Sequence, residues 1–250
     1  MKKTLLILST LLAVAGYSHA AETIRLAVDV PYEPFEYKAP DGSLTGFEID
    51  LGNAVCAEMK VKCEWVIQAW DGIIPGLLAY KYDAIFSSMS ITPERAEKVA
   101  FSKGYYNTPT GWFVKKGSSF DPSDKASVKG KKIGAQRGTI QDKYATDNLT
   151  DAEVVRYGTA DELVIDLYNG RLDAVILDYP VGETTILNGD KGADYQLVGK
   201  PFQLGDGAGV ALRPSDTDLL DKFNKALDTV KSNGVYDEIR KKYFSYDIKI

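Results

Sequence analysis

The chain has 250 residues, enough for one large domain or two modest ones, and a formal net charge of −5 at neutral pH. An acidic protein is repelled by nucleic acid and by anionic membrane surfaces, so neither is an expected partner. The only histidine, His19, lies in an N-terminal segment that we expect to be removed, which excludes histidine as a general base, triad member or metal ligand.

The N-terminus has the residue order of a secretory signal peptide. MKK precedes the apolar run TLLILSTLLAVAG and the segment YSHA, so we expect cleavage near Ala20 or Ala21 and a signal peptide over residues 1–20. Its removal takes away two lysines and no acid, which moves the net charge from −5 to −7. No later segment approaches about 20 uninterrupted apolar residues, so direct membrane insertion is not expected. No cysteine lies near the cleavage position, which favours a free periplasmic protein over a lipid-anchored one.

The first half of the mature chain alternates strands and helices. Apolar residues at alternate positions predict strands, and apolar residues at helical spacing predict the helices between them. The predicted order is a strand over 24–28, a helix over 47–59, a strand over 61–67, a short helix from Asp71 and a strand over 82–86. This order is typical of βαβ units in an α/β protein.

The two cysteines, Cys56 and Cys63, lie close together in the sequence. In an oxidising compartment such a pair usually forms a structural disulfide, and closing so short a loop contributes about 2.5 kcal/mol by chain entropy. A redox-active pair is the alternative, although that chemistry more often uses CxxC spacing.

A later segment echoes the first half. The predicted helix over 161–171 leads into LDAVILD at 172–178, as the short helix from Asp71 leads into YDAIFSS at 82–88. The likeness favours two similar α/β lobes over one extended sheet, and chance similarity of two buried strands is the alternative. A strand over 131–135 lies between the two segments, and helices over 216–231 and 235–243 end the chain.

Turn-forming residues separate the predicted lobes. We expect the chain to cross between them near 106–112 and again near 200–210. Lobe 1 then comprises 21–108 plus 207–250, and lobe 2 comprises 109–206. Two crossings form a hinge, and a hinge encloses a cleft.

Arg95 has an unusual position, in the first turn of a predicted helix. Thr92 suits the N-cap, Pro93 suits the first helical position, and Glu94 is the acid that a helix N-terminus favours. A cation at this end costs about 0.3–1 kcal/mol unless an anion lies between it and the helix. We therefore expect Arg95 and nearby helix amides to grip a carboxylate, with a surface ion pair to Glu94 or Glu97 as the alternative.

Polar and aromatic side chains gather after the predicted strands, where α/β proteins bind ligands. These residues are Asp29, Tyr32, Trp70, Ser87, Ser88, Ser90, Gln136, Arg137, Gly138, Thr139, Gln141 and Asp178. The set suits a zwitterion with an additional cation. Asp178 would accept from an α-ammonium, Asp29 would meet a distal cation, and the rings of Tyr32 and Trp70 would enclose that cation. The alternatives are that the aromatics are core residues and that the aspartates only cap helices.

The chain resembles the bacterial extracellular solute-binding proteins of family 3, which serve ABC transporters of polar amino acids. The resemblance is carried by GFEIDLGNAVCAEM at 46–59, DAIFSSMSITPERAEKVAFS at 83–102 and YDEIRKKYFSYD at 236–247, and it is strongest for lysine/arginine/ornithine- and histidine-binding members. It implies the two-lobed, hinge-closing periplasmic binding protein fold of type II. It also implies a monomer that binds a basic amino acid, partners a membrane permease, and uses no metal, cofactor or catalysis.

The same resemblance implies roles for single residues. Arg95 with the backbone at Ser90 and Thr139 would hold the α-carboxylate, and Ser88 with Asp178 would hold the α-ammonium. The side-chain pocket would be lined by Asp29, Tyr32, Trp70, Ser87 and Gln141. Two residues depart from the family pattern, because Ile140 stands where relatives often carry a hydroxyl and Trp70 replaces a smaller or different apolar residue. Arg137 is unassigned, and it would oppose a cationic ligand if it faced the pocket.

Other functions are compatible with these residues. AWDGIIPGL at 69–77 is also similar to opine-binding relatives, so an opine receptor is an alternative. A glutamine receptor is another, because a carboxylate such as Asp29 accepts from an amide as well as from a cation. A periplasmic dehydratase that uses Glu33 or Asp178 as an acid is an alternative from a different class. A sensor that signals through a partner protein is a third.

Overall fold

The computed structural model describes residues 22–250. The predicted signal peptide, with His19, lies outside the described residues. Within residues 22–250, no helix is both long and apolar enough to cross a bilayer.

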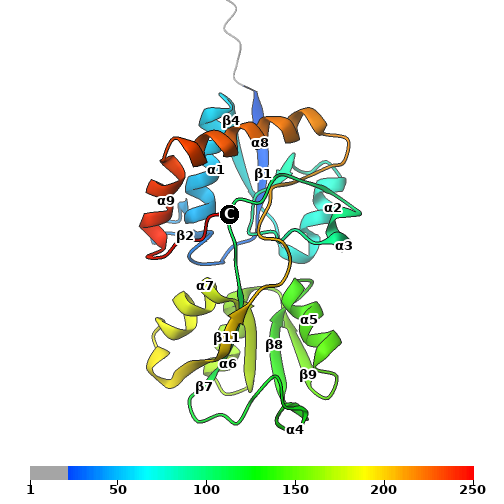
Figure 1. The fold of residues 1–250 in the computed structure, drawn as a ribbon, viewed down its shortest axis with the longest axis vertical. Coiled ribbons are helices and arrows are strands. Elements are labelled where there is room, and N and C mark those ends of the chain that lie inside the picture. Colours follow the sequence, from blue (N-terminus) through cyan, green and yellow to red (C-terminus); the bar gives the residue numbers. More distant parts are fainter. Residues whose placement is uncertain (1–21) are drawn as a thin grey trace, which may run out of the picture.

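Two five-stranded sheets form the centres of two lobes, which lie one above the other in Figure 1. In sheet order, the strands of lobe 1 are β4 (Lys62–Ile67), β1 (Thr23–Val28), β5 (Ala84–Ile85), β12 (Ala211–Leu212) and β6 (Ala100–Phe101). Those of lobe 2 are β11 (Tyr195–Phe202), β7 (Thr110–Lys115), β10 (Ala174–Asp178), β8 (Lys132–Gln136) and β9 (Glu153–Tyr157). The expectation of an α/β protein with two sheets, rather than one extended sheet, is confirmed.

Parallel pairing at the centre of each sheet positions the site. β1 pairs in parallel with β4 and β5, and β8 pairs in parallel with β9 and β10. The carboxyl ends of parallel strands meet at one edge of their sheet, so residues that follow β1 and β5 lie together, as do those that follow β8 and β10.

The helices of lobe 1 follow the predicted order. They are α1 (Phe47–Glu58), the 3-10 turn η1 (Trp70–Gly72), α2 (Ile73–Leu78), α3 (Pro93–Ala96), α8 (Thr217–Ser232) and α9 (Val235–Tyr243). α1 packs against α8 and α9, and its buried residues include Phe47 and Leu51, as the helical period predicts. A small hairpin of β2 (Tyr37–Lys38) and β3 (Leu44–Thr45) precedes α1.

The helices of lobe 2 lie around its sheet (Figure 1). They are α4 (Lys125–Val128), α5 (Ile140–Asn148), α6 (Ala160–Tyr168), α7 (Tyr179–Gly182), the π-helix η2 (Glu183–Leu187) and the 3-10 turn η3 (Gly192–Asp194). α6 begins with a complete capping box between Thr159 and Glu162, which fixes its start one residue before the predicted one.

The chain passes between the sheets twice. β6 belongs to lobe 1 and β7 to lobe 2, whereas β11 belongs to lobe 2 and β12 to lobe 1. Tyr106 and Ala208, one from each connecting segment, form an antiparallel bridge, so the two segments lie side by side. Both lie within the intervals where we expected crossings, and the exact division of the chain at residues 108/109 and 206/207 stays a prediction.

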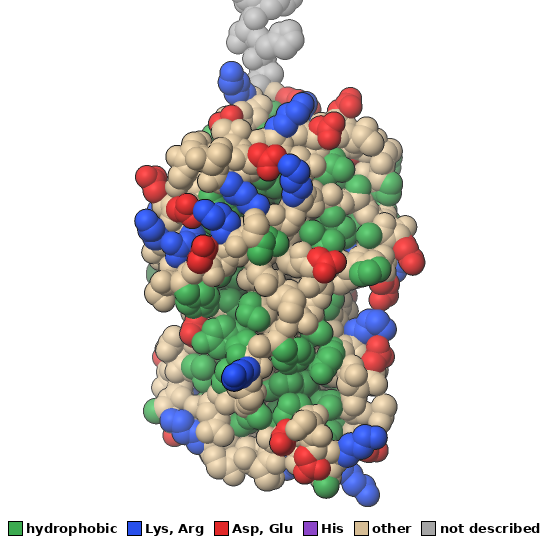
Figure 2. All heavy atoms as spheres, in the orientation of Figure 1, with side chains coloured by type: hydrophobic (Ala, Val, Ile, Leu, Met, Phe, Trp, Pro, Cys, Tyr) green, Lys and Arg blue, Asp and Glu red, His purple; other side chains and the backbone are tan. Residues whose placement is uncertain are grey.

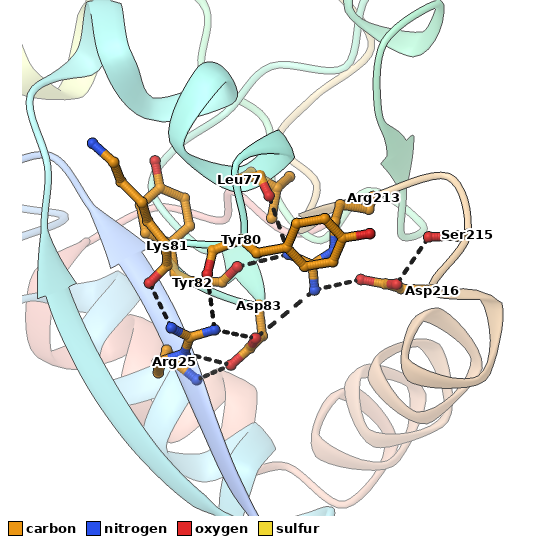
Figure 3. A network of polar contacts seen from close by, with 9 residues as sticks. All are labelled: Arg25, Leu77, Tyr80, Lys81, Tyr82, Asp83, Arg213, Ser215 and Asp216. Atoms are coloured by element: carbon orange, nitrogen blue, oxygen red, sulfur yellow. Dashed lines mark hydrogen bonds and ion pairs between the residues drawn. The ribbon is translucent and has the colours of Figure 1, made fainter.

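Covalent and ionic links stabilise lobe 1. Cys56 of α1 and Cys63 of β4 form the expected disulfide. Figure 3 shows a second link, in which the buried guanidinium of Arg213 donates to the carbonyl oxygens of Tyr82 (2.7 Å) and Leu77 (3.1 Å) and pairs with Asp216 (2.7 Å).

Surface chemistry differs along the molecule. On the face shown in Figure 2, hydrophobic side chains gather around the middle, whereas charged side chains lie mainly over the upper lobe and at the lower margins.

Candidate functional site

A cavity lies where the strand ends of the two sheets face each other. The space between its walls is about 330 Å³, and it is lined by Asp29, Tyr32, Glu36, Trp70, Ser87, Ser88, Ser90, Arg95, Gln136, Thr139, Ile140, Gln141 and Asp178. Residues up to Arg95 come from lobe 1 and the remainder from lobe 2. Its walls carry side chains of both charges together with hydroxyl and amide groups, which suits a small polar molecule.

Arg95 faces this cavity rather than pairing at the surface. Its Nη1 donates to the carbonyl oxygen of Ser90 at 2.9 Å, and its guanidinium carbon lies 5.2 Å from the centroid of the Trp70 ring. Thr92 caps the helix as predicted, accepting from the Arg95 amide. Burial lowers the pKa of the Arg95 guanidinium to about 10, and the charge of Asp178 opposes that change. The cation is therefore held in a poorly solvated position, where an anionic ligand would be favoured.

Asp178 ends β10 on the opposite side of the cavity. It is 4% exposed and accepts hydrogen bonds from the Tyr32 hydroxyl at 2.6 Å and from Gln141 Nε2 at 2.7 Å. It stands at the N-cap position of α7 but makes no side-chain cap bond, so capping does not explain it. Burial raises the pKa of Asp178 to about 6, while donors including Tyr32, and the charge of Arg95, oppose the rise.

Asp29 follows β1 and forms the second acidic position. Its Oδ2 accepts from Gln136 Nε2 at 2.6 Å, and its backbone amide donates to Ser87 Oγ at 2.9 Å. Burial raises the pKa of Asp29 to about 6, against hydrogen bonds from Gln136 and from the Trp70 backbone. The unsolvated carboxylate would be stabilised by a cation in the cavity.

Four contacts link the lobes around the cavity. Two are the hydrogen bonds described above, from Tyr32 to Asp178 and from Gln136 to Asp29. In the third, Trp70 Nε1 donates to the carbonyl oxygen of Gly138 at 3.2 Å. Arg137 pairs with Asp71 at 3.6 Å, with both side chains about half exposed. Arg137 does not line the cavity, so its charge does not oppose a cationic ligand there.

All ten predicted ligand-binding residues line this one cavity. Sequence reasoning placed Tyr32 and Gln141 in the side-chain pocket, and the structure positions both beside Asp178, where the α-ammonium is expected. Whether each residue contacts a ligand stays a prediction. Glu33, the alternative acid, does not line the cavity.

Three lining residues were not among the ten predicted ligand-binding residues. Ile140 was noted only as a departure from the family pattern. Gln136 was recognised as following the fourth predicted strand but was given no role in the site. Glu36 follows two apolar residues in the segment PFEY, and a buried acid there is recognisable only from the folded structure. In residues 22–250, no cluster of His, Cys, Asp and Glu side chains has the arrangement of a metal site.

Comparison with known proteins identifies the family. Residues 24–246 match the family model of bacterial extracellular solute-binding proteins, family 3. The chain belongs to this family. Among its curated members, an L-arginine-binding protein of Pseudomonas aeruginosa is 46% identical, over 99% of this chain and 98% of the relative. A lysine/arginine/ornithine-binding periplasmic protein of Escherichia coli is 40% identical, over 99% of each chain.

A solved structure supports the fold. An ancestral arginine-binding protein bound to glutamine superimposes with a TM-score of 0.83 at 34% identity, covering 91% of this chain and 100% of that chain. This chain therefore has the two-lobed fold of type II periplasmic binding proteins. The curated relatives of family 3 are binding proteins rather than enzymes.

Proposed function

We propose that this family 3 protein is the periplasmic receptor of an ABC transporter for basic amino acids, with arginine as its first ligand, followed by ornithine and lysine and then histidine. The observation that carries the proposal is the charge arrangement of one cavity. A partly buried cation, Arg95, lines the cavity together with two buried acids, Asp29 and Asp178, which come from different lobes.

The arrangement complements an amino acid with a cationic side chain. Arg95, together with backbone amides at Ser90 and Thr139, would bind the α-carboxylate through charge-assisted hydrogen bonds. Asp178 with Ser88 would bind the α-ammonium. Asp29 would bind the distal cation, with Trp70 and Ser87 beside it. Tyr32 and Gln141, which both donate to Asp178, would lie between this group and the α-ammonium. Gln136, which already donates to Asp29, joins this distal group.

Binding is coupled to closure because the ligand contacts belong to both lobes. Arg95 comes from lobe 1 and Asp178 from lobe 2, so one ligand bridges them and favours the closed conformation. Shifting a population from 1:99 to 99:1 needs about 5.5 kcal/mol of differential affinity. The closed form would then be presented to the membrane permease, and no chemistry is performed on the ligand.

A thermal-shift panel of the twenty common amino acids and several opines tests the ligand class. A ligand that binds only the folded protein raises its melting temperature, so arginine, ornithine and lysine should give the largest increases. Absence of a shift with every basic amino acid would reject the proposal. Mass spectrometry of ligands after incubation with the protein would detect a dehydrated product, which the receptor function does not predict.

A glutamine receptor is the second candidate. A solved relative at 34% identity holds glutamine, and a carboxylate such as Asp29 accepts from an amide as well as from a cation. The same panel separates the two, because a glutamine receptor would be stabilised by glutamine more than by arginine. A larger shift with an opine would identify the opine alternative.

A further inference from the structure

Two buried carboxyl groups lie close together, one in the cavity wall and one behind it. Glu36 is 1% exposed and comes from the segment before β2, and Glu48 is 0% exposed and lies in the first turn of α1. Glu36 lines the cavity, whereas Glu48 does not. The proposed function assigns neither residue a role. Two ionised carboxylates in such a poorly solvated position would each need to be paired or hydrogen-bonded.

Two hydroxyl groups connect these carboxyls in a chain. Ser88 Oγ lies 3.2 Å from Glu36 Oε2 and 2.7 Å from the Tyr106 hydroxyl oxygen. That hydroxyl oxygen lies 2.6 Å from Glu48 Oε1. The chain therefore contains three hydrogen-bonding contacts between oxygen atoms, and each contact requires one proton. Ser88 and Tyr106 supply only two protons.

Neighbouring hydroxyls do not supply the third proton. Ser87 Oγ lies 2.7 Å from the other oxygen of Glu36, and the Tyr105 hydroxyl lies 2.9 Å from Glu48 Oε1. Both hydroxyls therefore donate to these same two carboxyls and supply no proton to the three contacts that join Glu36, Ser88, Tyr106 and Glu48. Ser87 Oγ in turn accepts from the Asp29 amide, which leaves its own proton for Glu36. The third proton must therefore be carried by one of the two carboxyls.

The hydrogen-bond donors around each carboxyl decide whether Glu36 or Glu48 carries the third proton. Glu48 receives the backbone N–H of Ser88 at 2.7 Å and the hydroxyls of Tyr105 and Tyr106, and three donors favour the ionised form. Apart from its contact with Ser88, Glu36 accepts a hydrogen bond only from Ser87. Its Oε2 faces Ser88 alone, so this oxygen is the one that can hold a proton.

We propose that Glu36 is protonated at neutral pH and donates through Oε2 to Ser88, which donates to Tyr106, which donates to the Glu48 carboxylate. Because its proton is committed to Tyr106, Ser88 Oγ faces the cavity only as an acceptor. Ser88 is thereby positioned to receive an ammonium and not to donate to a carboxylate. Glu36 acts as a positioning residue, and its neutrality sets the charge of the site.

The electrostatic surroundings agree with this assignment. Burial raises the pKa of Glu36 well above its ordinary value, and the charge of Glu48 raises it further. Burial raises the pKa of Glu48 only to about 7, because Tyr106, Ser88 and Tyr105 donate to it. The other titratable groups facing Glu36 are Asp29 at the end of β1, Tyr32 in the same loop, and Tyr105 and Tyr106 before β7. No ion pair joins Glu36 to Arg95 or any other base in residues 22–250.

A neutral Glu36 changes the charge that the cavity offers. Asp29, Asp178 and Arg95 then leave the walls with a net charge of −1, whereas an ionised Glu36 would make it −2. A basic amino acid carries one net positive charge and so neutralises the first arrangement. This part of the inference rests on the proposed function, but the protonation of Glu36 does not.

Infrared spectroscopy of the protein without added ligand tests the protonation directly. Near pH 8, Asp29 and Asp178, whose pKa values burial raises to about 6, are ionised. We expect the wild-type protein to keep the C=O stretch of one protonated carboxyl at this pH. Absence of that band in the wild type overturns the proposal, with no variant required.

Two variants assign the band. Glu36→Gln should abolish it, whereas Asp178→Asn, which alters the proposed ligand site, should retain it. Persistence of the band in E36Q places the proton elsewhere and overturns the proposal. Failure of arginine to bind any of these proteins would reject the proposed function and leave the band, and hence this inference, standing.

Binding provides a second measurement. The glutamine amide can donate to Ser88 and accept from Ser87, as a protonated Glu36 does, so E36Q should bind arginine within about threefold of wild type by calorimetry. If Glu36 is instead ionised, E36Q removes a negative charge from the cavity and should weaken arginine binding by more than about tenfold.

Discussion

Replacing Asp178 with asparagine removes one charge from the cavity and keeps its shape. The asparagine oxygen can still accept from Tyr32, and the Gln141 amide can rotate to present its oxygen to the new nitrogen. Fold and hydrogen bonding should therefore persist. What disappears is the carboxylate that we propose for the α-ammonium.

The structure gives the size of the effect. Burial raises the pKa of Asp178 from 3.8 to about 6, which corresponds to about 3 kcal/mol against the ionised form. An ammonium about 4 Å away contributes about 4 kcal/mol at an effective dielectric constant of about 20, enough to offset that cost. We expect Asp178→Asn to lose about 3–4 kcal/mol of arginine binding, or about 100- to 1,000-fold in Kd.

Calorimetric titration of arginine near pH 8 measures this loss. Titration near pH 5 adds a check on its cause, because wild-type Asp178 is then largely protonated and must release a proton when the ammonium binds. Wild-type affinity should fall as pH drops through about 6, and the variant should lose part of that dependence, with Asp29 supplying the rest. Asp71→Asn, which alters an acid outside the cavity, is the matched control. A Kd for Asp178→Asn within about threefold of wild type would refute the assignment.

Three further predictions concern stability. Burial raises the pKa values of Asp29 and Asp178 to about 6, so the folded protein holds these two protons more tightly than the unfolded protein does. The stability that this contributes is fully present below about pH 4 and is lost as pH rises through about 6. Urea unfolding of the protein without ligand should show this pH dependence, the Asp29→Asn/Asp178→Asn double variant should lack it, and equal dependence in both would contradict the reasoning. Replacing Cys56 and Cys63 by alanine should cost about 2.5 kcal/mol of unfolding free energy and leave arginine affinity unchanged, since neither residue lines the cavity; altered affinity would link the disulfide to the site. Arg213→Met should lower the free energy of unfolding in urea by about 3–5 kcal/mol, because Asp216 and two buried carbonyl oxygens lose their donor. The control Lys62→Met alters an exposed ion pair with Glu64 and should cost less than about 1 kcal/mol. Equal costs would show that the Arg213 network is not a structural link.

Local patterns predicted the elements because they are determined by neighbours in the sequence. Helical spacing predicts α1, and the Thr92-Pro93 pair predicts where α3 begins. Strand ends predicted most of the cavity, since parallel strands bring their carboxyl ends together within each sheet. β1 and β5 thereby collect Asp29 and Ser87, and β8 and β10 collect Gln136 and Asp178.

Contacts between segments could not be predicted in the same way. Glu36 was missed because its burial depends on α1 and on the segment before β7, which supply Glu48 and Tyr106. The partner of Arg137 was missed because Asp71 belongs to the other lobe. The position of Gln141 beside Asp178 likewise follows from how α5 packs on β10, which no sequence period determines.

The two acids of the cavity already accept hydrogen bonds from the opposite lobe, and this bears on how a ligand could drive closure. Asp178 accepts from Tyr32, and Asp29 accepts from Gln136, so closing the lobes gives each carboxylate a neutral donor. A neutral donor to a charged group contributes only about 1.5–3 kcal/mol net, and the raised pKa values show that these donors do not compensate for burial. A ligand that adds a cation beside each acid supplies what the closed protein lacks. If the lobes separate, each acid loses its donor from the opposite lobe and gains water, so a cationic ligand would be favoured most with the lobes together, which is the differential affinity that closure requires.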